Sequence, residues 1–369
     1  MTDPFAALTG RGADHTVAEI AQQAELWRAV GRDVAAWLPE RTALLDLLAR
    51  RDVRIVLTGA GTSAFAGEVL APVLRRRRGG RVDAVPTTDV VAAPGAVFAE
   101  DVPTLLVSFA RSGDSPESLA ATELADELLT ECHHLVLTCN PDGELHRVRG
   151  RRENSRVLLM PEGSNDRGFA MTSSFTCMLL AARLVLDATE DPAAVADRIA
   201  ASVDAAFADR LAATGALAAQ GHGRVVYLGS GGLQGLARES ALKLLELTAG
   251  RVVAISDSPL GFRHGPKAFL DDDTLALVYL SSDPYTRRYD LDIVAELRRA
   301  LPEDRVVAVD PEGLEDLDDA LRALPAVLTA QLLALQTSLR LGLGSDNPFP
   351  SGEVNRVVQG VTIHPLARS

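Results

Sequence analysis

Hydroxyl-bearing residues gather at three points where an apolar run of this sequence gives way to a helix-like stretch. One of these points is ARSGDSPES, which overlaps the end of the strand-like run TLLVSFA. Backbone N–H groups and the helix dipole make such a point an anion site, and hydroxyls add neutral donors. The sequence therefore predicts binding of a phosphate or a phosphorylated sugar. The residues concerned are Gly61, Thr62, Ser63, Ser112, Gly113, Ser115, Thr172 and Ser173.

A second set of residues has the types needed for proton transfer. Glu239, Lys243 and Glu246 are spaced so that they share one face of a predicted helix. His264 lies in SDSPLGFRHGPKAF, where prolines and glycines fix the course of the chain. A carboxylate can act as a general base, an ammonium can offset developing charge, and an imidazole titrates near neutral pH. We therefore expect Glu246, His264 and Lys243 to be catalytic.

Simpler explanations exist for each pattern. The charged stripe could be an ion-pair stripe in solvent, and Ser115 could merely cap a helix. GAGTSA also fits the dinucleotide-binding pattern GxGxxA, with Asp83 or Asp89 where a ribose-binding acid should fall. A dinucleotide loop does not need hydroxyls at several strand ends, and the sequence has no run with metal-ligand spacing. We therefore expect no nicotinamide and no metal cofactor.

Strands and helices alternate along the sequence, as they do in a parallel sheet. Apolar residues at helical spacing over 16–50 predict two amphipathic helices with a break near Pro39. The predicted strands that follow are RIVLTGAG, VDAVP, TLLVSFA, HLVLTC and VLLMP. The sequence thus predicts an α/β fold with a doubly wound parallel sheet, which binds ligands at the carboxyl ends of its strands.

The alternation begins again in the second half of the chain. RIVLTGAG at 54 aligns without gaps with RVVYLGSG at 224, and the same offset places TLLVSFARS at 104 on TLALVYLSS at 274. Two matches at one offset predict an internal duplication. We expect a helical segment over 1–50, one α/β domain over 51–190, and a second over 205–369. The second domain includes a turn-rich tail, whose VTI could add an edge strand or cross to a neighbouring chain.

Composition limits the partners of this chain. Its 37 Lys and Arg against 50 Asp and Glu give a net charge of −13, which argues against binding nucleic acid or an anionic membrane. The start has no signal-peptide pattern and no apolar run is long enough to cross a bilayer, so we expect a cytoplasmic protein. The three cysteines form no CxxC pair, and we expect free thiols. His133, His134 and His222 lie beside a strand or in a linker, and we expect them to be structural or solvated residues without partners.

The motifs together resemble a known family. GAGTS, SGDSPES, ALKLLE, a His-Gly-Pro loop and VNRVVQGVTI resemble the tandem sugar isomerase (SIS) domains in the isomerase half of glucosamine-6-phosphate synthase. AEIAQQ, SPLGFRHGPK and SDNPFPSGEVNRVVQGVTI are more narrowly similar to the galactosamine-6-phosphate deaminase/isomerase group, also called tagatose-6-phosphate ketose/aldose isomerase. The resemblance implies two SIS domains, each a parallel five-stranded sheet between helices, in a homodimer.

The resemblance also implies roles for single residues. Glu246 matches the proton-transferring carboxylate, Lys243 matches a lysine beside it, and His264 matches a ring-opening histidine lent by the neighbouring subunit. The synthase lysine that forms an imine with fructose 6-phosphate falls on Gln359, so a covalent ketose imine by that route is not expected. The residues that match the sugar-phosphate loop are Ser112, Ser115, Thr62 and Ser63.

The expected function is conversion of galactosamine 6-phosphate to tagatose 6-phosphate and ammonia, by proton transfer between C2 and C1. Plain aldose–ketose isomerisation would use the same base, and the sequence does not decide between C4 epimers. The alternative is a non-catalytic sugar-phosphate sensor with the same domains. Such regulators usually carry an added DNA-binding head, and the stretch before the first strand is too short and too acidic for one.

Overall fold

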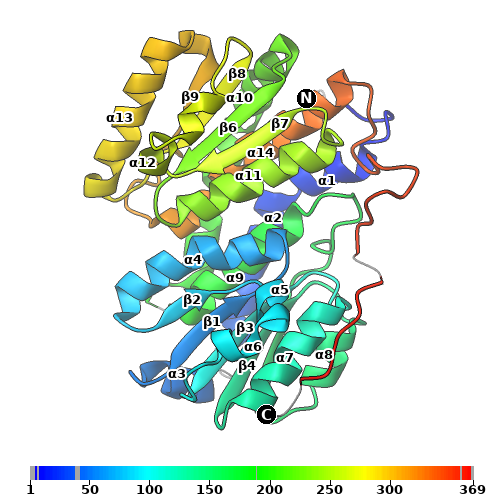
Figure 1. Cartoon of the computed structure of the whole chain (residues 1–369), viewed down its shortest axis with the longest axis vertical. Helices are drawn as coiled ribbons and strands as arrows, with labels where there is room; N and C mark the ends of the chain where they lie inside the picture. Colours follow the sequence, from blue (N-terminus) through cyan, green and yellow to red (C-terminus); the bar gives the residue numbers. More distant parts are fainter. Residues whose placement is uncertain (1–4, 6–7, 38–41, 188, 358–359, 367–369) are drawn as a thin grey trace.

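The computed structural model describes residues 5, 8–37, 42–187, 189–357 and 360–366 of the chain. Five parallel strands form the sheet of the first half, in the order β2-β1-β3-β4-β5 (Figure 1). Their bounds are β1 (Arg54–Thr58), β2 (Val82–Ala84), β3 (Thr104–Ala110), β4 (Cys132–Thr138) and β5 (Ser155–Leu159). The central strand β3 is buried along its whole length, as a strand covered on both faces must be. The five predicted strands are therefore confirmed.

The sheet of the second half has four parallel strands within the described residues, in the order β7-β6-β8-β9. The expectation of five strands in this half is wrong, because no strand follows β9 among the described residues and the VTI segment at 361–363 is not in a sheet. The chain instead enters a long helix, α14, which is buried over most of its length. The strands are β6 (Arg224–Gly229), β7 (Val253–Asp257), β8 (Thr274–Tyr279) and β9 (Val306–Val309).

The two sheets repeat one arrangement. Strand β1 pairs with β3 so that Arg54 lies opposite Thr104, and β6 pairs with β8 so that Arg224 lies opposite Thr274. Both pairs are related by the offset seen in the sequence, and each sheet places its second strand outside its first. The internal duplication therefore holds at the level of strand register, while β5 has no counterpart in the second half.

Helices cover both sheets. Within the described part of the chain, three helices precede the first strand instead of the predicted two. The break expected near Pro39 lies outside the described residues. The helices at the start and between the halves are α1 (Asp14–Ala21), α2 (Gln23–Trp37), α3 (Thr42–Ala49) and α10 (Pro192–Gln220). Those of the first half are α4 (Thr62–Arg78), α5 (Thr87–Ala92), α6 (Pro94–Val97), α7 (Pro116–Leu128), α8 (Glu144–Arg149) and α9 (Ser173–Leu186). Those of the second half are α11 (Leu233–Leu247), α12 (Pro259–Phe262), α13 (Pro284–Ala300) and α14 (Asp319–Arg340), with the short 3₁₀ helices η2 (Pro266–Phe269) and η3 (Glu303–Arg305).

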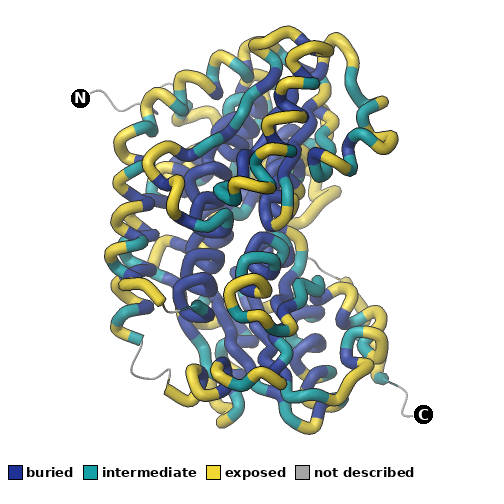
Figure 2. The backbone as a smooth tube through the Cα atoms, turned by 90° about the vertical axis from the view of Figure 1, so that its left-hand side faces the viewer, coloured by how far each residue is buried: buried dark blue, intermediate teal, exposed yellow. Residues whose placement is uncertain are grey.

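The two halves share one large hydrophobic core. It includes Leu57 of β1 and Tyr227 of β6, together with most of α9 and α14. Figure 2 shows the buried chain continuing from one lobe of the molecule into the other. The domain boundaries expected from the sequence stay a prediction. The two halves pack against each other through this shared core rather than as separate domains joined by a linker. No described helix has both the length and the apolar character that a membrane span requires.

Helices α4 and α11 cross closely, and this crossing positions the candidate site. Gly235 of α11 faces α4, where an added Cβ would lie 2.8 Å from Glu68 Cβ and 2.9 Å from Val69 N. Arg238 of α11 is paired with Glu68 at 2.5 Å. The missing side chain at Gly235 lets the helices approach, so the N-terminus of α4 in the first half lies beside the polar stripe of α11 in the second.

Candidate active site

The loop after β3 forms one wall of a pocket of about 120 Å³. Gly113 has a positive φ of 71°, a conformation that glycine adopts without strain. The loop is held from behind, because Asn140 Nδ2 donates to Ser112 O at 2.8 Å and Leu145 N donates to Gly113 O at 2.9 Å. Ser112, Gly113 and Ser115 all line the pocket. The structure therefore brings the three predicted residues of this loop together.

Ser115 occupies the N-cap position of α7 without capping it. Its hydroxyl donates to Glu117 Oε2 at 2.7 Å, and no side chain caps the helix. Pro116 takes the first helical position, as the sequence suggests. The simple explanation of Ser115 as a helix cap therefore does not hold, and its hydroxyl contributes to the pocket wall instead.

The loop at the start of α4 divides its residues between two environments. Gly61 has a φ of 56° and turns the chain into α4. Ser63 lines the same pocket as Ser112. The Thr62 hydroxyl instead accepts a hydrogen bond from Lys243 Nζ at 3.0 Å. This loop thus contacts both the pocket and the polar stripe of α11.

The dinucleotide interpretation of GAGTSA finds no ribose-binding acid at Asp83. The Asp83 carboxylate accepts from Arg54 Nε at 2.8 Å, so it is occupied within the first sheet. Asp89 lies on the short helix α5. The hydroxyl-rich strand ends remain the better guide to the ligand.

The third hydroxyl-rich point does not open into the pocket. Thr172 and Ser173 are fully buried at the start of α9, and their backbone N–H groups donate to Asp166 at 2.9 and 3.0 Å. The Thr172 hydroxyl also donates to Asp166, and the Ser173 hydroxyl donates to Glu19 O at 2.7 Å. The Asp166 carboxylate therefore occupies the place where an anion would bind. Of this segment, Met171, just before these residues, lines the pocket, and Thr172 and Ser173 do not.

The polar stripe of α11 is buried rather than solvated. Lys243 and Glu239 are fully buried, and the Glu246 side chain keeps 24% of its surface exposed. Lys243 Nζ donates to Glu246 Oε2 at 2.5 Å and lies 3.6 Å from Glu239 Oε1. Neither oxygen of Glu239 has a hydrogen-bond partner among the described residues. The alternative of an exposed ion-pair stripe is therefore excluded.

Burial and charge set the protonation states of this stripe. Burial raises the pKa of Glu239 to about 8, although the charge of Lys243 acts in the opposite direction. Burial disfavours the ammonium of Lys243, but Glu239 and Glu246 outweigh that effect and raise its pKa above the ordinary value. The stripe therefore holds a charged lysine and a protonated Glu239 near pH 7, with Glu246 partly exposed at its outer end.

The raised pKa of Glu239 makes the stability of the fold depend on pH. A carboxyl group whose pKa is raised on folding stabilises the fold below its unfolded pKa, and this contribution is lost as the pH rises through the folded value. The wild-type protein should therefore lose unfolding free energy between pH 5 and pH 8. In Glu239→Gln this loss should be smaller by about 1 kcal/mol or more. Urea unfolding at the two pH values measures it. Equal pH dependence in wild type and variant would contradict the assignment.

His264 lies on the segment that follows β7, outside the helix that carries the stripe. It is exposed in the turn between α12 and η2. No hydrogen bond or ion pair joins its ring to the described residues, whereas its neighbours Arg263 and Lys267 both pair with Glu296.

Comparison with known proteins identifies the family of the chain. The model of the SIS domain family matches residues 47–188. The chain is 59% identical to the AgaS protein of Streptomyces coelicolor, over 99% of this chain and all of that protein. The chain belongs to the AgaS family of SIS-domain proteins. The D-galactosamine-6-phosphate deaminase AgaS of Shewanella sp. strain ANA-3 is 42% identical, over 98% of this chain and 94% of that protein.

A solved structure of the same family has the same fold. The tagatose-6-phosphate ketose/aldose isomerase from Escherichia coli is 41% identical, covers 99% of each chain, and superimposes with a TM-score of 0.86. The resemblance derived from the sequence motifs is therefore confirmed. Gln359, the position on which the synthase lysine falls, lies outside the described residues, and so does its neighbour at 358.

Two arginines of the pocket were missed from the sequence. Arg111 and Arg356 both line it, together with the serines. Arg111 stands between the strand TLLVSFA and the serines of SGDSPES, so its position next to the loop was visible in the sequence. Arg356 lies in the C-terminal tail, far along the chain from the loop, and no local signal places it there.

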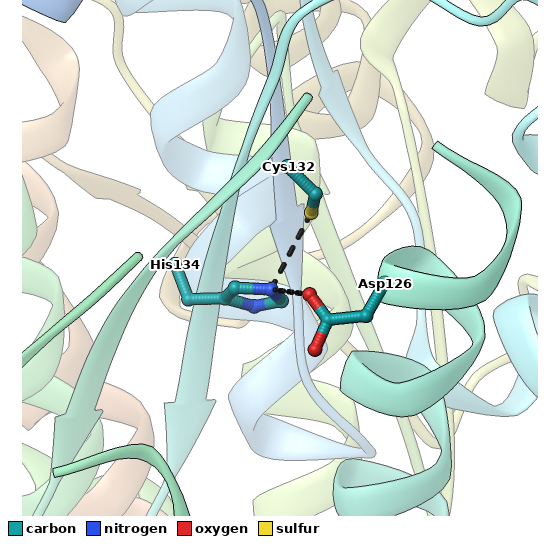
Figure 3. Close-up of side chains that lie close together, drawn as sticks. All are labelled: Asp126, Cys132 and His134. Carbon is teal, nitrogen blue, oxygen red and sulfur yellow. Dashed lines mark hydrogen bonds and ion pairs between the residues drawn. The ribbon is translucent and has the colours of Figure 1, made fainter. Parts of the chain in front are cut away.

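A cluster with metal-binding residue types lies away from this pocket, between α7 and β4. Asp126, Cys132 and His134 point toward one another (Figure 3). His134 Nε2 lies 2.7 Å from Asp126 Oδ1 and 3.4 Å from Cys132 Sγ, so the expectation that His134 lacks partners is wrong. It is also wrong for His133 and His222, whose Nε2 atoms lie 3.3 Å from Glu131 Oε1 and 2.8 Å from Gln220 Oε1. Arg149 Nη1 pairs with the other Asp126 oxygen at 2.6 Å, and burial raises the pKa of the Cys132 thiol to about 12. The charge of Arg149, which is paired with Asp126, disfavours a cation at this cluster.

Proposed function

We propose that this AgaS-family chain converts galactosamine 6-phosphate and water to tagatose 6-phosphate and ammonia. The observation that carries the proposal is the partly exposed Glu246, held by buried Lys243 at the point where the Thr62 loop of the first half meets α11. The same loop supplies Ser63 to the hydroxyl-lined pocket. One loop thus contacts both the lysine that holds the base and the pocket proposed for the phosphate. This arrangement supports chemistry on a phosphorylated sugar.

The phosphate binds in the Ser112–Ser115 loop and anchors the far end of the sugar. Binding energy from this remote group orients C1 and C2 at the base. His264 moves a proton between O1 and O5 to open the ring. Glu246 takes the proton from C2 and returns it to C1, because one carboxylate can reach both adjacent carbons.

The proton shift turns the 2-amino aldehyde into a 2-imino alcohol. Water adds to C2 of this ketimine, the C–N bond breaks, and ammonia leaves as the C2 carbonyl forms. Lys243 keeps Glu246 oriented through its hydrogen bond, and its charge offsets negative charge that develops on the substrate.

We further propose a homodimer with shared active sites in the cytoplasm. The exposed position of His264 supports a site completed by a second copy of the chain. The three cysteines are all free and buried, in keeping with a reducing compartment. A subunit that lends His264 to its partner makes each site depend on the dimer.

Ammonia release tests the proposed function. The purified protein should release one ammonia for each galactosamine 6-phosphate consumed, with tagatose 6-phosphate as the sugar product. Glucosamine 6-phosphate in a parallel assay reports the preference between C4 epimers. Binding of the substrate without ammonia or ketose would overturn the proposal in favour of a sugar-phosphate sensor, and ketose formation without ammonia would leave only the isomerase.

A further inference from the structure

The pocket contains an arginine that is buried without a partner. Arg111, at the carboxyl end of β3, is 7% exposed. No hydrogen bond or ion pair joins its guanidinium to the described residues, although it lines the pocket beside Ser112. Burying a charged group without a partner is costly, and such groups in proteins are normally paired. The missing partner of Arg111 is therefore expected to be an anion that enters the pocket.

The electrostatic surroundings of Arg111 favour a ligand over an internal carboxylate. Burial lowers the pKa of Arg111, and the acidic groups around it, first among them Asp166, oppose this only in part. Glu246 belongs to the same group of opposing charges, so the proposed base lies within electrostatic reach of Arg111. None of these carboxylates forms an ion pair with the guanidinium. Its five donors stay available for a planar or tetrahedral oxyanion.

A second arginine reaches the pocket from the C-terminal tail. The tail leaves α14 in the second half and runs beside the first half (Figure 1). Two contacts fix its start: Asp346 accepts from Thr16 N at 2.8 Å, and the ring of Phe349 lies 5.1 Å from that of Phe169. Arg356 follows and lines the pocket. Among the described residues that line it, the other cationic side chain is Arg111. Arg356 is exposed, so its position depends on the anchored tail.

We propose that Arg111 and Arg356 bind the 6-phosphate of the substrate from two sides, so that the C-terminal tail closes the phosphate site. The proposal rests on the proposed function, because it assigns residues to the phosphate of that substrate. A phosphate monoester carries about −1.5 to −2 charges at pH 7, which two guanidinium groups match. The serine hydroxyls and loop amides then orient the phosphate, and the arginines supply the attraction that a chain of net charge −13 otherwise lacks.

Binding of an unreactive analogue tests the proposal without turnover. Galactitol 6-phosphate has the phosphate but neither the aldehyde nor the amine, and calorimetry measures its affinity. Arg111→Met and Arg356→Ala should each weaken its binding by about 10- to 100-fold, the effect of a lost charged hydrogen bond. Arg111→Lys keeps the charge but loses the forked geometry, so it should also bind more weakly. The control Arg298→Ala, at an exposed arginine of α13, should bind as the wild type does.

Thermal unfolding and kinetics separate a binding role from a structural one. Arg111→Met removes an unpaired buried charge and should leave the unfolding temperature unchanged or higher. With galactosamine 6-phosphate, KM should rise more than kcat falls in both variants. Wild-type affinity in Arg111→Met or Arg356→Ala would overturn the role of that residue. A lower unfolding temperature in Arg111→Met, with full affinity in Arg111→Lys, would show that Arg111 is structural.

The two proposals fail in different ways. A wild-type protein that binds galactitol 6-phosphate through both arginines but releases no ammonia would contradict the proposed function and leave the arginine site standing. Ammonia release that survives unchanged in both arginine variants would support the function and overturn the arginine site. Galactitol without phosphate should bind equally weakly to all variants, because only the phosphate contacts the arginines.

Discussion

Glu246→Gln should lower kcat for ammonia release by about 10²- to 10⁴-fold, the range for loss of a positioned acid–base group. An amide oxygen can still accept the hydrogen bond from Lys243, so the geometry of the stripe and KM should change little. The amide cannot take the C2 proton. Steady-state ammonia release measures the loss, and incorporation of deuterium from D₂O at C1 of the product reports the proton transfer itself.

A matched control separates this effect from a general change in charge. Glu123 is exposed on α7, so Glu123→Gln removes the same charge without entering the site. That variant should keep wild-type kcat and KM. A Glu246→Gln enzyme with undiminished turnover would rule out Glu246 as the base and transfer the role to another group, with Glu239 the first to examine.

His264→Asn should also lose about 10²- to 10⁴-fold in kcat, because ring opening then lacks its proton shuttle. The subunit arrangement makes a sharper prediction. In a dimer with shared sites, a mixed dimer of Glu246→Gln and His264→Asn chains has one site with both defects and one site with none. Random mixing makes half of the dimers mixed, so activity should return to about a quarter of the wild-type value.

Each inactive variant mixed with itself is the control for this experiment, and neither should regain activity. Differently tagged chains, unfolded and refolded together, allow the mixed dimers to be isolated and counted. Complete lack of rescue in isolated mixed dimers would show that Glu246 and His264 of one chain act together, and the proposal of a site shared between subunits would be wrong.

The strands and the duplication could be predicted because their signals are local. A strand buried on both faces needs a continuous apolar run, and each predicted run in the first half became a strand. The register of β1 with β3 and of β6 with β8 follows the sequence offset, since equivalent positions are paired in both halves. The size of the second sheet was not predictable in this way. Whether a chain adds an edge strand depends on what covers the edge.

The hydroxyl-rich points show where such local reasoning stops. All three looked alike in the sequence, yet Asp166 occupies the donors of Thr172 and Ser173, whereas Ser112 and Ser115 line a pocket. Asp166 precedes Thr172 by only six residues, but nothing in the spacing shows that its carboxylate folds back onto α9. The competition between an internal carboxylate and a ligand is decided by the path of the loop.

The sequence by itself determined the residue types, the helix that carries Glu239, Lys243 and Glu246, and the strand ends that carry the serines. Tertiary structure alone decided that the stripe is buried, because the close crossing of α4 and α11 removes it from water and shifts the pKa of Glu239. It also decided that Arg111 and Arg356, which lie far apart along the chain, line the same pocket. The physical reason is that spacing along a helix or strand follows from backbone geometry, whereas burial and charge pairing depend on which distant segments pack together.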